Sequence, residues 1–330
     1  MPIIQYSMHD LNKTSPERYS TSLYRKEFIL HRYEGNPIIT PKDFPDADAI
    51  YNCGQVMFEG QTLLLLSVAP RHGTPALHVA LSRDGYHFEI EKEPFISRLE
   101  DPLWHELDIW PIDPRVTQIG DEYYIVRPLS GPLQPAAVLE RTKDWKTREF
   151  IECIALPPNR VPCLFPEKIG GSYMRLDRPS NGPRGEIWLS SSPDLIHWGK
   201  HRRVVAPPIN HVWAVEKIGP TPPIKTKHGW LEIFHGVLTY AGGARYSLGA
   251  MLLDLHDPQR VLGVAQGWIL TPDAPYEFMG NCQNTVFTCG AIADESIDEI
   301  RVYYGAADTC IGLATGSLNE LISCCLSGKQ

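Results

Sequence analysis

The chain has 330 residues, of which 43% are hydrophobic and 21% are charged, as is ordinary for a globular protein. Its formal net charge of −8 argues against non-specific nucleic-acid binding, which needs a basic surface. No segment has the roughly 20 apolar residues that a membrane-spanning helix requires, and residues 1–28 contain no apolar stretch typical of a signal peptide.

Residues 1–35 are polar and mixed, and we expect them to form a short N-terminal extension. Within them, Ser15 and Pro16 are typical of a helix start, with serine as the cap and proline at the first helical position. Three roles are open for this segment: packing on the main domain, assembly of a homo-oligomer, or a poorly ordered tail.

From residue 36 onward one pattern recurs five times. Each copy has a turn, a strand rich in aliphatic or aromatic residues, a second strand and a turn of the Ser/Asp/Trp type. The copies lie at residues 58–85, 119–145, 169–198, 227–257 and 300–319. Their spacing of roughly 50–65 residues is typical of propeller blades and too long for most helical solenoids. The sequence therefore predicts an all-β fold, a five-bladed β-propeller that forms one domain over residues 36–330.

The two ends of the propeller carry further expectations. Because the ends of a propeller chain usually complete one blade together, we expect residues 36–40 to pair with the fifth blade. Helical periodicity is almost absent from the chain. Residues 318–322 are therefore expected to form a short turn or to begin a last strand.

The eight cysteines form no C-x-x-C pair and have no zinc-finger spacing with histidine. Together with the missing signal peptide, this predicts reduced thiols and a cytoplasmic location. No cluster of His, Asp and Glu has metal-ligand spacing, so no metal site is expected.

Asp113 is the first candidate site residue, because loops and inner strands of a propeller line its central channel. Pro114 favours an extended Asp113, from which a carboxylate can point into the channel. The alternative is an ordinary Asp-Pro turn.

Four cationic or titratable side chains follow on later blades: Arg160, Arg178, Lys217 and His235. Arginines can clamp an anion with two parallel hydrogen bonds, and we expect His235 at a strand end before a glycine. Facing one channel, the four groups would bind an oxyanion such as phosphate, with Asp113 nearby as an acid. The alternatives are surface ion pairs for the arginines and a structural role for His235.

In these stretches the chain resembles glycoside hydrolase family 130, the β-mannoside phosphorylases and related β-mannosidases. The matching motifs are Asp113-Pro114-Arg115-Val116-Thr117, Asn159-Arg160, Arg178-Pro179-Ser180, Lys217-Ile218-Gly219 and His235-Gly236-Val237, with further matches at 164–169, 222–226, 248–255 and 303–309. The resemblance covers residues 36–325.

The resemblance implies an inverting enzyme on a five-bladed propeller, with Asp113 as the general acid. In the family this acid protonates the glycosidic oxygen through the 3-hydroxyl of the bound mannosyl unit. Phosphate then attacks the anomeric carbon from the opposite face. The implied phosphate-binding residues are Arg160, Arg178, Lys217 and His235, and the implied substrate-binding residues are Asn52, Asp308, Tyr246 and Arg115.

The expected reaction converts a β-mannoside and inorganic phosphate into α-mannose 1-phosphate and a shortened acceptor. Phosphate is a co-substrate, and no cofactor is needed. The expected partners are a mannose-containing oligosaccharide and phosphate, without nucleic acid or membrane.

The chain departs from the family pattern at several positions. Ser67 and Ala69 stand where phosphorylases commonly carry Arg and Glu, Ile112 replaces the Glu before the catalytic Asp, and Val161 replaces an Asp. Sugar contacts are therefore expected to differ from those of known members.

Two other functions remain open. One is an inverting β-mannosidase on the same scaffold, in which Glu216 or Glu232 activates water, because an inverting hydrolase needs a second carboxylate. The other is a sugar-binding propeller without turnover, in keeping with the altered first blade. A five-bladed furanosidase would need three carboxylates on separate blades, and only Asp113 and Asp308 are candidates.

Overall fold

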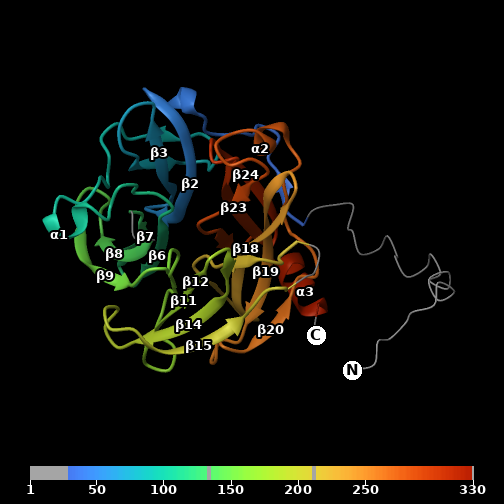
Figure 1. The fold of residues 1–330 in the computed structure, drawn as a ribbon. Coiled ribbons are helices and arrows are strands. Elements are labelled where there is room, and N and C mark those ends of the chain that lie inside the picture. Colours follow the sequence, from blue (N-terminus) through green and yellow to red (C-terminus); the bar gives the residue numbers. More distant parts are fainter. Residues whose placement is uncertain (1–28, 132–134, 210–212, 329–330) are drawn as a thin grey trace, which may run out of the picture.

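The computed structural model describes residues 29–131, 135–209 and 213–328, which form five β-sheets arranged around a common axis (Figure 1). The five-bladed β-propeller predicted from the repeats is confirmed. The described helices are short: η4 (Pro41–Asp43), α1 (Pro102–His105), α2 (Pro275–Phe278) and α3 (Leu318–Ser327). None of them is long and apolar enough to cross a membrane.

The first three blades each pair four antiparallel strands, which are consecutive in blades 1 and 2, whereas β12 and β13 interrupt the order in blade 3. Blade 1 consists of β2 (Ala47–Phe58), β3 (Gln61–Pro70), β4 (Ala76–Ser82) and β5 (Glu89–Ile90). Blade 2 consists of β6 (Arg115–Ile119), β7 (Glu122–Leu129), β8 (Ala136–Thr142) and β9 (Glu149–Ala155). Blade 3 consists of β10 (Cys163–Leu164), β11 (Tyr173–Asp177), β14 (Ile187–Ser192) and β15 (Gly199–Val205).

The last two blades recruit strands from elsewhere in the chain. Blade 4 consists of β16 (Lys217–Gly219), β17 (Ile224–Thr226), β18 (Gly229–Tyr240), β19 (Gly243–Leu253) and β20 (Val261–Val264), extended by β12 (Ser180–Asn181) and β13 (Arg184–Gly185). Blade 5 consists of β21 (Val286–Phe287), β22 (Ile292–Asp294), β23 (Glu299–Ala306), β24 (Cys310–Ser317) and β1 (His31–Arg32).

The repeated Ser/Asp/Trp turns have a common hydrogen-bonding pattern. The carboxylates of Asp84, Asp144, Asp194 and Asp254 each accept hydrogen bonds from the backbone N–H groups two and three residues further on. Asp favours such turns because its side chain replaces a backbone acceptor. Four of the five sequence repeats therefore end in such a turn, which lies between the last two strands of blades 1 to 4, whereas the fifth ends in α3.

Blade 5 closes the ring with strands from both ends of the described chain. β1 pairs antiparallel with β24, with His31 opposite Thr315. Ile39 forms a bridge with Ile311, so the predicted pairing of residues 36–40 with the fifth blade is confirmed. β1 lies upstream of residue 36, whereas the helix expected at Ser15 lies outside the described residues.

A buried carboxylate fastens this closure. Glu277 of α2 is fully buried and accepts two hydrogen bonds of 2.8 Å from the Arg32 guanidinium. The Tyr304 hydroxyl donates to the same carboxylate at 2.8 Å, and so do the backbone N–H groups of Asp273 and Ala274. A buried charge is tolerated when it is paired and fully hydrogen-bonded, as Glu277 is.

The expectation of a turn or strand at residues 318–322 is wrong, because α3 begins there. Ser317 caps the helix by accepting a hydrogen bond from the Glu320 N–H at 3.0 Å. The buried residues Leu318, Leu321, Ile322 and Cys325 follow the spacing i, i+3, i+4, i+7, which places them on one helical face. That face packs on blades 4 and 5.

Candidate active site

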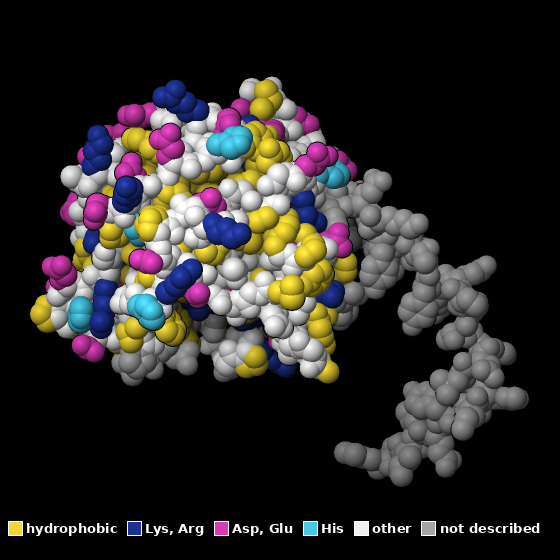
Figure 2. Space-filling view, turned by 90° about the horizontal axis from the view of Figure 1, so that it is seen from above, with side chains coloured by type: hydrophobic (Ala, Val, Ile, Leu, Met, Phe, Trp, Pro, Cys, Tyr) yellow, Lys and Arg dark blue, Asp and Glu magenta, His cyan; other side chains and the backbone are white. Residues whose placement is uncertain are grey.

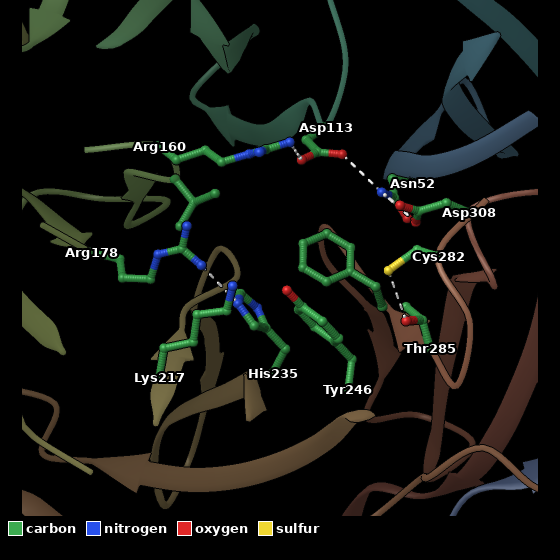
Figure 3. Close-up of a pocket in the computed structure, with 12 residues that line it drawn as sticks. Asn52, Asp113, Arg160, Arg178, Lys217, His235, Tyr246, Cys282, Thr285 and Asp308 are labelled. Atoms are coloured by element: carbon green, nitrogen blue, oxygen red, sulfur yellow. Dashed lines mark hydrogen bonds and ion pairs between the residues drawn. The ribbon is translucent and has the colours of Figure 1, made fainter. Parts of the chain in front are cut away.

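One pocket receives residues from all five blades (Figure 3). Its lining comprises Asn52, Asp113, Arg160, Val161, Arg178, Lys217, His235, Tyr246, Cys282, Thr285, Phe287 and Asp308. With the exception of Arg115, every site residue expected from the sequence lies in this lining. The arrangement follows from the topology, because the loops that precede the inner strands meet at one end of the propeller.

Two carboxylates share one amide on one side of the pocket. Asn52 of β2 donates from Nδ2 to Asp113 Oδ1 at 2.9 Å and to Asp308 Oδ1 at 3.2 Å. Asp113 lies before β6, and Asp308 lies in the turn between β23 and β24. Blades 1, 2 and 5 are thus joined at this point, and the amide fixes both acids relative to each other.

The backbone at these three residues is in the left-handed region. The φ angles of Asn52, Asp113 and Asp308 are 43°, 54° and 49°. The expectation of an extended Asp113 is therefore wrong: Pro114 disfavours a right-handed helical Asp113 but does not exclude a positive φ. Asn and Asp are the non-glycine residues that best tolerate this conformation, which clusters at functional sites.

Ser67 of β3 holds two of these backbones together. Its fully buried hydroxyl donates to the carbonyl of Asn52 at 2.9 Å and accepts from the N–H of Asp113 at 3.1 Å. The departure noted at position 67 thus places a small hydrogen-bonding side chain directly behind the two residues.

Asp113 also forms an ion pair across the pocket. Arg160 Nη2 lies 2.8 Å from Asp113 Oδ2. Burial acts to raise the pKa of Asp113, but the charges of Arg160 and Arg115 and the hydrogen bond from Asn52 outweigh it and hold the pKa below its ordinary value. Asp113 is consequently a carboxylate in this state.

Arg115 lies behind the pocket rather than in its lining. It is 1% exposed, donates from Nη1 to the carbonyl of Asp113 at 2.7 Å, and stacks 5.4 Å from the centre of the Phe287 ring. In this position it contacts the backbone that carries the acid and contributes positive charge to the pocket.

Asp308 has the opposite titration behaviour from Asp113. Burial, together with the nearby charge of Asp113, raises the pKa of Asp308 to about 6. Two neighbouring carboxylates whose pKa values are pushed apart commonly mark acid–base chemistry.

The other side of the pocket is cationic. Arg178 donates from Nη1 to Nε2 of His235 at 3.0 Å. Because arginine only donates, His235 accepts through Nε2 and is neutral. Burial, followed by the charges of Arg178 and Arg115, holds the pKa of His235 well below its ordinary value.

Lys217 stands beside this pair at the start of β16, with Nζ 5.0 Å from the centre of the Tyr246 ring. Burial, then the charges of Arg178 and Arg160, lowers the pKa of Lys217 to about 8. The buried Nε of Arg178 and Nδ1 of His235 have no hydrogen-bond partner. Buried donors of this kind are normally satisfied, so these two nitrogens stand out beside the cationic side chains of the pocket.

These groups are held by close packing of the backbone. His235 lies inside β18 and not at a strand end as expected; it is opposite Gly219 of β16. A Cβ at Gly219 would collide with the His235 imidazole, which explains a glycine there. Asn159 accepts from the Arg178 N–H at 3.2 Å and so ties the loop that carries Arg160 to β11.

The two glutamates considered as water-activating bases lie outside the pocket lining. Glu232 is fully buried and accepts from the Thr221 N–H at 2.7 Å, and burial raises its pKa well above the ordinary value. Glu216 accepts from the N–H and hydroxyl of Thr239. Neither carboxylate faces the pocket.

Cys282, Thr285 and Phe287 were not predicted from the sequence. Cys282 and Thr285 come from the segment between α2 and β21 and Phe287 from β21 itself, where no motif or charged residue indicates a site. The Thr285 hydroxyl donates to Cys282 Sγ at 3.2 Å. Their place in the pocket depends on how blade 5 closes, which local sequence does not reveal.

On the face of the molecule in Figure 2, Lys and Arg side chains alternate with Asp and Glu. Within the described residues, no group of His, Cys, Asp and Glu is arranged to hold a metal ion.

The family model described as beta-1,4-mannooligosaccharide phosphorylase (Glyco_hydro_130) matches residues 34–327. The chain therefore belongs to glycoside hydrolase family 130.

Characterised relatives cover almost the whole chain. The chain is 34% identical to a beta-1,4-mannooligosaccharide phosphorylase of Ruminococcus albus over 89% of its length and 90% of the relative. It is 31% identical to a beta-1,2-mannobiose phosphorylase of Listeria innocua over 89% and 97%. The structure of the Listeria innocua beta-1,2-mannobiose phosphorylase in complex with beta-1,2-mannobiose superimposes with a TM-score of 0.80 at 30% identity, covering 90% of this chain and 99% of that one.

Proposed function

We propose that the protein is an inverting glycoside phosphorylase that cleaves a β-mannoside with inorganic phosphate and releases α-mannose 1-phosphate. The observation that carries this proposal is the arrangement of charge in the pocket. Asp113 and Asp308 lie on one side, and Arg178, Lys217 and His235 lie on the other (Figure 3). The names of the relatives support the same reaction class.

In the proposed reaction Asp113 is the acid, which acts through the substrate 3-hydroxyl as in the family. Phosphate occupies the cluster of Arg160, Arg178, Lys217 and His235, where it satisfies the unpartnered donors. One phosphate oxygen bonds to the anomeric carbon, the glycosidic bond breaks, and the leaving oxygen gains a proton that originates on Asp113. Because phosphate arrives as an anion, no base is required.

We propose that the mannosyl unit binds against Asn52, Asp308 and Tyr246. Arg115 is assigned a supporting role, because it contacts the Asp113 backbone and lies outside the lining. Inorganic phosphate is the co-substrate, and the reaction needs no cofactor.

An inverting hydrolase is disfavoured by the same arrangement. Such an enzyme needs a second carboxylate across the sugar from the acid to activate water. In the described lining, the side opposite Asp113 carries cations and no carboxylate. A sugar-binding propeller without turnover gives no reason for an acid beside a cluster of cations in one pocket.

We also propose a cytoplasmic location and no nucleic-acid or membrane partner. Cys53, Cys163, Cys289, Cys310 and Cys325 are buried free thiols, which are typical of a reducing compartment. A phosphorylase also conserves the bond energy as a sugar phosphate, which is useful where the product can be metabolised directly.

The test is sugar release from β-1,2-, β-1,3- and β-1,4-linked mannosides with and without inorganic phosphate. Mannose 1-phosphate formed only with phosphate supports the proposal and identifies the linkage. Free mannose formed equally without phosphate overturns it in favour of the hydrolase.

Asp113→Asn is expected to lower kcat by a factor on the order of 10²–10⁴, because the substitution removes the general acid. The measurement is the initial rate of mannose 1-phosphate release from the active substrate. Near-normal turnover in this variant would remove Asp113 from the proposed role, and Glu216→Gln, outside the pocket, is the control with unchanged rate.

A further inference from the structure

Asp113 cannot donate a proton in the state that the structure shows. Its Oδ1 accepts from Asn52 at 2.9 Å, and its Oδ2 accepts from Arg160 at 2.8 Å. Both oxygens are thus occupied by donors, and an ionised carboxylate is an acceptor only. A general acid must carry a proton, so one of the two donors has to leave before catalysis.

Arg160 is the donor that can leave. The Asn52 side chain is buried, and its Nδ2 also holds Asp308. Arg160 lies in a loop, its side chain is 36% exposed, and its ion pair with Asp113 is its one salt bridge among the described residues. By contrast, Arg178 is buried against His235.

Arg160 also belongs to the proposed phosphate cluster. We propose that the incoming phosphate takes Arg160 from Asp113 Oδ2, and that Asp113 then takes up a proton from solvent at that oxygen. The co-substrate thereby prepares the general acid. This inference rests on the proposed function and adds the order of events: phosphate binds before the acid is protonated.

The groups that face Asp113 make this exchange favourable. Arg160 and Arg115 stabilise its charge, whereas an ionised Asp308 opposes it, because the two carboxylates repel each other. Burial and the charge of Asp113 raise the pKa of Tyr51 and of Cys289, so both of these neighbours stay neutral. Once phosphate neutralises Arg160, Arg115 and the Asn52 hydrogen bond still favour the carboxylate, but burial and the neighbouring Asp308 oppose it with one ion pair fewer to overcome. The pKa of Asp113, which the arginines hold low, therefore rises on phosphate binding.

The proton balance of the cycle closes. Solvent supplies one proton to Asp113, the acid delivers it to the leaving oxygen, and the phosphate dianion becomes the monoanionic phosphoester of mannose. Asp113 is again a carboxylate and recovers Arg160 when the product leaves.

The experiment is calorimetric titration of the complete protein with sodium sulfate at pH 6, in two buffers with different ionisation enthalpies. Sulfate is used because it does not titrate in this range, whereas phosphate does. The wild-type protein is expected to take up more protons than Asp113→Asn, by up to about one per bound sulfate. Subtracting the variant removes any uptake by His235 or Lys217, and repeating the comparison in the Asp308→Asn background removes uptake by Asp308, whose pKa is about 6.

Affinity provides a second readout. Asp113→Asn frees Arg160, so sulfate is expected to bind roughly fivefold tighter than to the wild type, as for the loss of a competing, partly exposed ion pair. Asp308→Asn is the matched control, because it removes a nearby carboxylate that makes no hydrogen bond to Arg160; its gain is expected to be smaller.

Equal proton uptake in wild type and Asp113→Asn, or equal gains in affinity for the two variants, would overturn the inference while leaving phosphorolysis intact. A wild-type protein that binds neither sulfate nor phosphate would instead overturn the proposed anion site, and the inference with it.

Discussion

Asn52, Asp113 and Asp308 combine a left-handed backbone with shared hydrogen bonds, so the pocket is built from residues in costly conformations. Each such residue costs on the order of 1–3 kcal/mol, which the surrounding structure must offset. Ser67 and Asn52 contribute to that by holding backbone and side chains at once. The conformational energy of these three left-handed residues is thus the cost of placing Asp113 and Asp308 side by side.

Asp308→Asn is expected to stabilise the protein while lowering activity. The folded-state pKa of Asp308 is about 6, above its ordinary value of 3.8, so ionisation of Asp308 lowers the stability of the fold. The cost is absent below pH 3.8, grows between these values and is complete above pH 6. At pH 7.5 we expect a gain of about 2 kcal/mol in the free energy of unfolding, allowing for partial exposure.

The measurement is denaturant unfolding of wild type and Asp308→Asn at pH 7.5 and pH 4. A gain that persists unchanged at pH 4 would contradict the assigned titration. Asn keeps the acceptor for Asn52, so the comparison changes charge with little change in packing.

The lowered pKa of Lys217 predicts that the affinity for phosphate falls at alkaline pH. Because the pKa of Lys217 is lowered to about 8, the ammonium loses its charge above that pH and the affinity for phosphate falls. Lys217→Arg is expected to flatten this limb, since a guanidinium stays charged. The measurement is the phosphate KM between pH 6.5 and 9.5; an unchanged alkaline limb in the variant would exclude Lys217 as its source.

At the scale of the elements, the molecule depends on short strands fastened by specific side chains. β1 contains only His31 and Arg32, and Glu277 of α2 fixes it through the Arg32 guanidinium. Local sequence could not predict this, because a two-residue strand has no periodicity and its partners lie far along the chain. The long hairpins and their Asp-containing turns were predictable, because each leaves a repeated local signature.

Glu277→Ala is expected to lower the free energy of unfolding by about 3–5 kcal/mol, because it leaves Arg32, Tyr304 and two backbone N–H groups without their acceptor. The control is Glu299→Ala, which breaks a partly exposed ion pair with Arg301 and should cost about 1 kcal/mol or less. The measurement is urea unfolding. Equal decreases in the free energy of unfolding for the two variants would show that the buried Glu277 carboxylate stabilises the fold no more than an exposed ion pair does.

At the scale of the whole molecule, the five-fold repeat made the architecture predictable, and the order of motifs made most of the pocket predictable. What the sequence could not provide was geometry. Arg115 and Asp113 lie two residues apart, yet one is behind the pocket and the other inside it. Cys282, Thr285 and Phe287 reach the pocket only through the closure of blade 5.

Phosphate is expected to stabilise the whole fold, because the unoccupied cluster places buried cations side by side. At a phosphate concentration 100 times the Kd, the free energy of unfolding should rise by about 2.7 kcal/mol, which raises Tm by several degrees. The measurement is thermal unfolding in sodium phosphate against sodium chloride of equal ionic strength. Arg178→Ala should lose most of the shift; a full shift in this variant would place the stabilising anion elsewhere.

The closure of blade 5 also has a consequence for biosynthesis. Arg32 can form its ion pair only after Glu277 has been synthesised, 245 residues later in the chain. At ordinary rates of synthesis this takes roughly 10–50 s. The pocket lies across the same seam, with Asn52 from the first blade and Asp308 from the last. By the proposed mechanism, a nascent chain cannot complete the pocket before its last blade is made, so we expect activity to begin only when translation of that blade is finished.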